Sequence, residues 1–298
     1  MLDFKLPELS DKRWVDECLK HAGSISCEYT FGNTFIWQKV YGTEICRYKD
    51  FFICAWSFDG SPAYSLPLGE GDFTDAVNQI INDAKERGVK ARIYGVTSGY
   101  LDMLRESFTG KFKYKFNDAF SDYIYLTEKM ALLSGKKYHG KRNHISNFKK
   151  NNPDWKFELI TRDNIGDCIE LHKRWLDEKD GSSNEDYTEE LSAVLTAFES
   201  YEELGFVGGL IRVNGEAVAY TMGEPHPASD CFVTHFEKAV SSVQGAYAII
   251  NQEFTRNCLL PYKYVNREED LGIEGLRRAK LSYNPEIILE KGVAVYND

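Results

Sequence analysis

Apolar and polar residues follow one another along this chain in short, well-separated blocks. In the first half, the aromatic block Thr34 to Tyr41 and the alternating block Ile45 to Trp56 predict the strands of a meander. A tight turn is expected at Lys49 and Asp50 within the second block. A loop with Pro and Gly follows from Gly60 to Gly71. The other blocks predict a helix over 73–87 that ends at Gly88, a strand over 91–94, a helix over 100–108, and strands over 112–116 and 123–126.

The second half repeats this order of elements. Asn214 and Gly215 are the turn signal of a hairpin over 207–221. Around the hairpin the pattern predicts helices over 165–178, 189–200 and 246–258, strands over 231–237 and 262–266, a helix starting near Ile273, and a final strand pair over 287–289 and 293–296. Because hairpin, helix, strand, helix and strand occur twice, we expect an α/β protein with mixed sheets and two similar domains. We place the domains at 1–130 and 156–298, with a connecting helix at 131–155.

Composition narrows the class of protein. The 298 residues are 43% apolar and contain no run near the roughly 18 apolar residues that span a bilayer, so we expect a cytoplasmic globular protein. The seven cysteines are scattered without a CxxC pair, which predicts neither a disulfide framework nor a metal site. A net charge of -10 argues against broad nucleic-acid binding.

The connecting helix departs from this acidic balance. Between Ala131 and Pro153 there are six Lys or Arg and no Asp or Glu. Such a stretch is either a solvated linker helix or a docking face for an anionic ligand, with Lys141 and Arg142 at its centre.

The stretch 264–285 carries polar residues where a buried stripe is expected. If Asp270 caps a helix that begins near Ile273, then Lys280 and Tyr283 share one face with apolar residues. Arg277 is one turn from Lys280, so both cations could hold one carboxylate, phosphate or oxyanion. Tyr283 could donate a proton or only pack. Asn266 and Asp270 flank the helix start and could position an acceptor or cap the helix.

His235 and Glu237 lie on one face of the predicted strand over 231–237, because side chains alternate with period two. This pair is a candidate proton acceptor, although strand ends also carry polar residues for solubility. We interpret His172 as a core residue and His226 as a loop residue.

The junction after this strand leads into a helix N-terminus through Gln244, Gly245, Ala246 and Tyr247. Unpaired N–H groups at such a junction can hold phosphate. The corresponding junction of the first half carries Glu70, Asp72 and Asp75, which would repel phosphate, so we expect the second half to carry the activity. An ordinary strand-to-helix turn is the alternative.

Three segments together resemble a known family: KKYHGKRNHISNFKK, HFEKAVSSVQGAYAIINQEF and NREEDLGIEGLRRAKLSYNP. They are similar to the C-terminal domain of bacterial phosphatidylglycerol lysyltransferases and to stand-alone cytoplasmic proteins grouped with it. The resemblance implies two consecutive acetyltransferase-type (GNAT) folds, as in the Fem-type aminoacyltransferases, and Lys280 matches a lysine thought to steady the tetrahedral intermediate there.

We therefore expect acyl or aminoacyl transfer to an amine or hydroxyl acceptor in the second domain. Glu237 or His235 would act as the base, Lys280 with Arg277 would stabilise the oxyanion, and the turn 244–246 would hold the donor. No cofactor is expected to be tightly bound. The donor is acyl-coenzyme A, or aminoacyl-tRNA bound by the basic stretch 136–150. The competing hypothesis is a non-catalytic module that binds a small anion or a protein.

Overall fold

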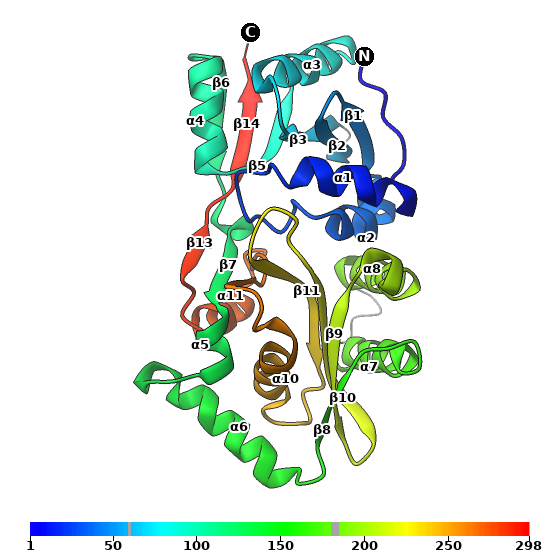
Figure 1. The fold of residues 1–298 in the computed structure, drawn as a ribbon, viewed down its shortest axis with the longest axis vertical. Coiled ribbons are helices and arrows are strands. Elements are labelled where there is room, and N and C mark those ends of the chain that lie inside the picture. The colour runs from blue at the N-terminus through cyan, green and yellow to red at the C-terminus, as the bar shows by residue number, and fades with distance from the viewer. Residues whose placement is uncertain (59–60, 180–184, 298) are drawn as a thin grey trace.

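The computed structural model describes residues 1–58, 61–179 and 185–297, which form two mixed sheets with helices on both sides (Figure 1). The first half of the chain contains α1 (Lys12–Leu19), α2 (Phe31–Tyr41), β1 (Glu44–Tyr48), β2 (Phe51–Phe58), β3 (Ser61–Ser65), β4 (Leu68–Gly69), α3 (Phe73–Glu86), β5 (Arg92–Val96), α4 (Ser98–Ser107), β6 (Phe112–Phe116), β7 (Asp122–Leu126), α5 (Thr127–Leu132) and α6 (His139–Asn151).

The second half contains β8 (Lys156–Leu159), α7 (Ile165–Glu178), α8 (Glu185–Glu199), α9 (Tyr201–Leu204), β9 (Val207–Val213), β10 (Glu216–Pro225), β11 (Cys231–Ala239), α10 (Ala246–Phe254) with a π-helical turn at Thr255–Leu259, β12 (Tyr264–Asn266), α11 (Glu274–Leu281), β13 (Ile287–Leu289) and β14 (Gly292–Tyr296). Most predicted elements are confirmed, including the hairpin β9–β10 and helix α3, which is followed by Gly88 at a positive φ of 73°.

The two sheets have the same plan, and each borrows one strand from the other half of the chain. The first sheet has the order β1-β2-β3-β5-β14-β6, and the second has β13-β7-β12-β11-β10-β9-β8. In both, a parallel pair (β3–β5 or β11–β12) is followed by an antiparallel strand from the opposite half, β14 or β7. The duplication inferred from element order is therefore present, but the sheets exchange strands across the boundaries placed at 130 and 156.

Three local predictions were wrong. The block Thr34 to Tyr41 is part of helix α2, whose first turn is capped by the Thr30 hydroxyl accepting from the Asn33 N–H. The segment 60–71 is more than a loop, because its described part contains β3 and β4. The last two strands do not pair with each other, since β13 joins β7 and β14 joins β5 and β6.

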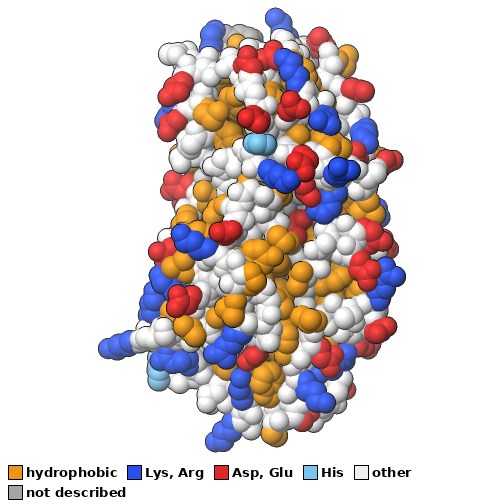
Figure 2. Space-filling model, viewed as in Figure 1, with side chains coloured by type: hydrophobic (Ala, Val, Ile, Leu, Met, Phe, Trp, Pro, Cys, Tyr) orange, Lys and Arg blue, Asp and Glu red, His pale blue; other side chains and the backbone are white. Residues whose placement is uncertain are grey.

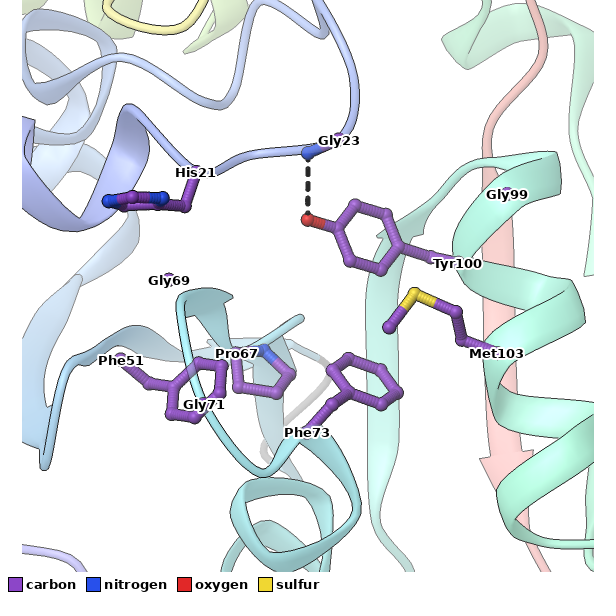
Figure 3. Close-up of a pocket in the computed structure, with 10 residues that line it drawn as sticks. All are labelled: His21, Gly23, Phe51, Pro67, Gly69, Gly71, Phe73, Gly99, Tyr100 and Met103. Carbon is purple, nitrogen blue, oxygen red and sulfur yellow. Dashed lines mark hydrogen bonds between the residues drawn. The ribbon is translucent and has the colours of Figure 1, made fainter.

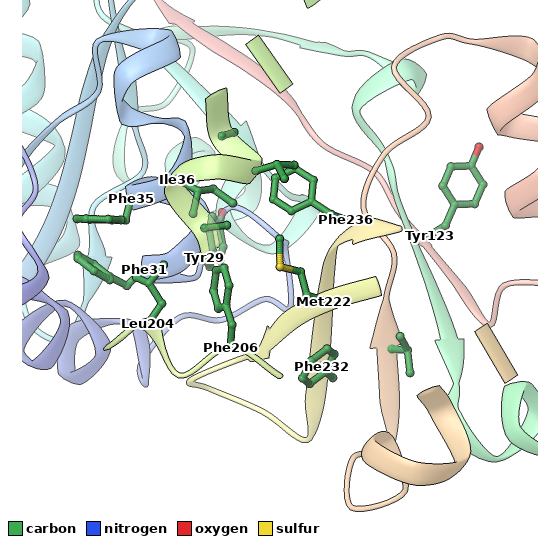
Figure 4. Close-up of a cluster of buried hydrophobic side chains, with 14 of the residues drawn as sticks. Tyr29, Phe31, Phe35, Ile36, Tyr123, Leu204, Phe206, Met222, Phe232 and Phe236 are labelled. Carbon is green, nitrogen blue, oxygen red and sulfur yellow. The ribbon is translucent and has the colours of Figure 1, made fainter. Parts of the chain in front are cut away.

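Helix α2 was mistaken for a strand because it is apolar on more than one side. Its side chains Phe31, Phe35 and Ile36 face Phe206 and other residues of the second half in one buried cluster (Figure 4). A helix covered on several sides loses the amphipathic period that identifies a surface helix. At Gly32 a Cβ atom would lie 2.3 Å from the Glu224 carboxylate, so glycine is what allows this close contact between the halves.

Five side chains form a junction cluster where the exchanged strands cross: Cys27, Asp122 and Lys291, which are buried, and Glu28 and Glu269, which are partly exposed. The Lys291 Nζ atom lies 2.7 Å from the Asp122 carboxylate, 3.6 Å from Glu28 and 3.8 Å from Glu269, and Lys291 is 1% exposed. Burial alone would lower the pKa of Lys291, but the carboxylates raise it well above its ordinary value. The ammonium is therefore charged and ties β7 to the segment that leads into β14.

Replacing Lys291 with Met should destabilise the protein by about 3–5 kcal/mol, because Asp122 would remain as an uncompensated buried charge. Urea unfolding followed by circular dichroism measures this loss. Adding Asp122→Asn should restore part of it. The control is Lys113→Met, an exposed lysine on β6, which should leave the free energy of unfolding nearly unchanged. Equal effects at Lys291 and Lys113 would contradict the role of the junction cluster.

Candidate active site

Strands β11 and β12 form a fork in the second sheet. They pair in parallel only from Cys231 to Val233, opposite Tyr264–Asn266, and β11 then continues to Ala239 without β12 beside it. On its other side β11 carries a bulge, because Thr234 and Phe236 pair with consecutive residues of β10 and leave His235 without a partner. A bulge bends a strand and redirects its side chains, so the residues after His235 turn toward the end of β12.

An ion pair bridges the fork. The Arg267 guanidinium, on the residue that follows β12, lies 2.7 Å from the Glu237 carboxylate on β11. Asn251 of α10 donates a second hydrogen bond to Glu237 at 3.1 Å. Both side chains of the pair are little exposed, 14% for Arg267 and 12% for Glu237, so the interaction is poorly screened by water.

Aromatic rings and a lysine complete the fork cluster, which consists of Glu237, Arg267, Asn251, Tyr125, Tyr283 and Lys141. The Arg267 guanidinium lies 5.0 Å from the ring centroid of Tyr283 and 5.9 Å from that of Tyr125. From α6, the Lys141 Nζ atom lies 3.8 Å from the Tyr283 centroid. Two cations therefore share one aromatic platform, a geometry that cation–π attraction stabilises.

Lys141 is the side chain of this cluster with a pKa closest to neutral. It is half-buried, and burial together with the positive charge of Arg267 lowers its pKa to about 8. The negative charge of Glu237 acts in the opposite direction and raises this pKa. An amine with that pKa exists in both protonation states near physiological pH and can accept a proton. Tyr283 differs, because burial raises its pKa and keeps the phenol protonated.

The predicted donor-binding turn lies at the N-terminus of α10. Gly245 has φ of 87°, and a Cβ there would approach the His144 carbonyl of α6 to 2.7 Å, so this glycine seats α10 against α6. Gln244 is exposed, Ala246 is buried, and Tyr247 is 44% exposed. The sequence between Lys238 and Gln252 has no acid, so the positive end of the helix dipole is not neutralised from within this segment.

Lys280 is buried as expected, but its contacts differ from the predicted ones. Its ammonium donates to the main-chain carbonyls of Arg267, Glu268 (3.0 Å) and Glu269 (2.5 Å). Burial, and then Arg267, lower the pKa of Lys280 to about 8, while the three carbonyls bind its protonated form. All three N–H groups are thus used by the backbone, and in this arrangement none is left for an oxyanion.

Arg277 and Lys280 do not share one anion in this structure. Arg277 binds the Asp270 carboxylate at 2.6 Å, and this contact lowers the pKa of Asp270 to about 2 although burial would raise it. Asp270 accepts from the Gly272 N–H at 2.8 Å, whereas the N-cap position of α11 is Ile273. Asp270 thus shapes the turn before the helix and does not cap it.

Both ring nitrogens of His235, the predicted base, have carboxylate partners in this structure. Its two ring nitrogens lie 3.0 Å from Glu224 and 2.8 Å from Glu268, and its side chain is 1% exposed. Burial alone lowers the pKa of His235, but the two carboxylates raise it to about 9. The imidazole is therefore charged at neutral pH and connects β10 with the segment after β12.

Two further predicted ligand-binding residues have structural partners. Asn266 donates to Asp122 and to the Ile25 carbonyl, and Arg142 donates to the carbonyls of Leu133 and Gly135. The exposed lysines of the basic stretch are Lys136, Lys137 and Lys150. Figure 2 shows Lys and Arg side chains along the lower left edge of the molecule, where α6 lies.

The other histidines lie as interpreted. His172 is fully buried, with Nδ1 2.8 Å from the Tyr220 hydroxyl, and burial lowers its pKa to about 3. His226 follows β10 in a loop and is buried there. Cys27, Asp122 and Glu269 have a spacing that could suit a metal ion, but the Lys291 ammonium already occupies the centre of that group.

Sequence reasoning missed Arg267, Tyr125 and Asn251. Arg267 had one available signal, because it directly follows a predicted strand, and ligands of open α/β sheets bind at the carboxyl ends of strands. Tyr125 offered none, since it lies on β7, which was assigned to the other domain.

The duplicated sheet order and the bulged, forked β11 define a tandem GNAT architecture. A tandem GNAT protein from the clavulanic acid biosynthesis pathway has the same fold, with a TM-score of 0.50, 8% identity, and coverage of 99% of this chain and 98% of that chain. None of the helices within the described ranges is both long and apolar enough to cross a membrane.

The chain belongs to the family described as phosphatidylglycerol lysyltransferase, C-terminal, which it matches over residues 20–294. A conserved protein of unknown function from Bacteroides thetaiotaomicron is 37% identical over all of both chains, with a TM-score of 0.96. L-PGS from Bacillus licheniformis is 15% identical, with a TM-score of 0.67 over 98% of this chain and 94% of that one. An uncharacterized protein of Mycoplasmoides gallisepticum is 23% identical over 181 residues, which are 59% of this chain and 56% of that protein. Family and fold connect the chain with acyl and aminoacyl transfer in the broad sense.

Replacing His235 with Gln should remove a pH-dependent part of the stability. Since the folded pKa of about 9 exceeds the ordinary 6.5, this contribution is complete below pH 6.5 and is lost as the pH rises through 9. The difference in the free energy of unfolding between the native protein and H235Q should therefore shrink over that interval in urea titrations. The control is His144→Gln, at an exposed histidine. Its free energy of unfolding should change with pH in the same way as that of the native protein. A difference that stays constant would show that His235 is not held charged.

Proposed function

We propose that this protein transfers an aminoacyl group from an activated ester to an amine or hydroxyl acceptor at the fork cluster. The observation that carries the proposal is the position of Glu237, Arg267, Tyr283 and Lys141 around the point where β11 parts from β12. Membership in the phosphatidylglycerol lysyltransferase C-terminal family supports the reaction class. The acid-free turn at α10 adjoins the same strand and would receive the phosphate-bearing part of the donor.

The residues take roles that differ from those expected from sequence. The acceptor attacks the donor carbonyl, a C–N or C–O bond forms, and the neutral Lys141 amine takes the acceptor's proton. Arg267, rather than Lys280, faces the developing oxyanion, because its guanidinium is at the fork and the Lys280 donors are occupied. The ester C–O bond to the donor then breaks, and the protonated Tyr283 phenol supplies the proton of the leaving oxygen. The Lys141 ammonium, which lies against the Tyr283 ring, then returns the acceptor's proton to the phenolate, so both residues regain their starting states.

Lys280 and Glu237 act as positioning residues in this scheme. Lys280 fixes the backbone from Arg267 to Glu269, and Glu237 with Asn251 orients the Arg267 guanidinium. Small displacements of a charge-stabilising group are costly to a transition state, so these contacts bear on the rate without touching the reacting atoms.

Substituting Lys141 tests the role of the base. With aminoacyl-tRNA and a small amine acceptor, product measured by mass spectrometry should form faster as the pH rises through about 8, when Lys141 loses its proton. Lys141→Met should lower kcat/KM by roughly 10²–10⁴-fold and flatten the pH profile.

Two further variants make this test specific. Lys141→Arg keeps the charge but cannot accept a proton, so it should be as slow as Lys141→Met. The exposed Lys173→Met on α7 should behave like the native protein. Native rates in Lys141→Arg would exclude Lys141 as the base.

The donor can be tested through the exposed lysines of the basic stretch. If the donor is aminoacyl-tRNA, reversing Lys136, Lys137 and Lys150 to Glu should weaken tRNA binding and reduce the slope of log K against log salt by about 2–3. The same triple reversal at Lys111, Lys113 and Lys115 on the first half is the control, since these lysines are also exposed.

Acyl-coenzyme A is the alternative donor, and it predicts the opposite pattern. Coenzyme A would then raise the Tm of the native protein, and a Ser242→Asp substitution at this exposed position would abolish that rise. The affinity for tRNA would be the same in both triple reversals as in the native protein. Ser242 is preferable to Gly245 for this purpose, because a side chain at Gly245 disrupts the contact with α6 whether or not a ligand binds.

A non-catalytic binding module is the second candidate function, recognising a small anion or a protein. The contacts of His235 and Lys280 favour it. The side-chain nitrogens of these two predicted catalytic residues all have partners within the protein itself. In that case the native protein would transfer nothing at any pH, and Lys141 variants would change only ligand affinity.

A further inference from the structure

The first half has a hollow at the position that corresponds to the fork of the second half. It lies where the parallel strands β3 and β5 end and where α3 and α4 begin, and its volume is about 250 Å³. Figure 3 shows Phe73, Tyr100 and Met103 on one side of this space and Phe51 and Pro67 on the other. In this view His21 lies above Phe51 and Pro67. The carboxyl ends of parallel strands are the usual ligand position in open α/β sheets.

The wall of this hollow is mostly aromatic and apolar. Phe51, Phe73 and Tyr100 are 3%, 9% and 7% exposed, so their positions are fixed by packing. The Tyr100 hydroxyl accepts from the Gly23 N–H at 3.1 Å, which holds the ring in place (Figure 3). Rings with fixed faces suit the body of a small apolar ligand, and their electron-rich faces attract cations.

A second hollow of about 310 Å³ adjoins the first, because His21 and Gly71 line both. Its walls contain three carboxylates, those of Glu17, Asp50 and Glu70. Arg47 also lines it and lies 3.6 Å from Asp50, Lys20 lies 2.7 Å from Glu17, and the third carboxylate, Glu70, lies 3.7 Å from His21. The lining therefore keeps a net negative charge, but one partly offset by these partners. One end of the combined space is thus aromatic, and the other is negatively charged.

We propose that the two hollows together form a binding site for a small organic amine. The aromatic hollow takes the apolar body of the molecule, and the carboxylate-lined hollow takes its ammonium group. A phosphate-bearing ligand is disfavoured, because Asp72 and Asp75 lie at the adjoining N-terminus of α3. The site lies in the first half and is separate from the transfer proposed at the fork cluster, so either proposal can fail without the other.

Phenethylamine is a suitable probe, with 3-phenylpropionate as its negatively charged counterpart. In a ligand-observed NMR titration of the full chain, the amine should bind saturably and at least about tenfold more tightly than the acid. Exposed Glu70→Gln should weaken amine binding by about threefold, as expected for one partly screened carboxylate.

Gly99→Leu is the blocking variant, because Gly99 lines the aromatic hollow and a Cβ there meets no atom within 4 Å. It should abolish amine binding while leaving Tm near the native value. Gly166→Leu is the matched control, since Gly166 is likewise the second residue of a helix, with open space around a Cβ. It should bind the probe as the native protein does.

Three results would overturn the proposal. Equal affinity for the amine and the acid would remove the role of the carboxylates. Undiminished binding in Gly99→Leu would place the probe elsewhere. A native protein that shows no saturation at the solubility limit of the amine would show that the hollows bind no such ligand.

Discussion

The reciprocal exchange of β7 and β14 is the constraint on which the rest of this structure depends. Each sheet is complete only with a strand from the other half, so the relative position of the halves is set by hydrogen bonding within the sheets. The Lys291 ammonium lies at the crossing and neutralises Asp122, which is fully buried. A buried charge pair of this kind adds little net stability, but it penalises any arrangement that separates its partners.

The segment from Arg267 to Asp270 shows how this constraint reaches the candidate site. Lys280 binds its carbonyls, His235 binds the Glu268 side chain, and Arg277 binds Asp270. Glu268 is held at φ of 57°, a conformation that a glutamate adopts only when its surroundings require it. The guanidinium of Arg267 is thereby presented to the fork by a backbone with little freedom.

Local patterns in the sequence were enough for most of the fold and for part of the site. Periodicity identified α3 and α7, and the Asn214–Gly215 turn identified the hairpin, because these signals lie within one element. Strand alternation identified Glu237, helical spacing identified Tyr283, and the absence of acids from 131–153 identified Lys141. Arg267 and Tyr125 meet them only through strand pairing between distant segments, and Lys280 was expected to be functional because its backbone acceptors cannot be read from spacing.

The position of β14 in the first sheet also has a consequence for biosynthesis. A ribosome makes β14 after all the strands of the second sheet, although its place lies between β5 and β6. Until then the first sheet has two unpaired edges, which are the parts of a nascent β-protein most prone to pairing with other chains. The second sheet has all its strands once β13 has emerged, because β7 is made early, whereas the first sheet cannot close before β14 emerges.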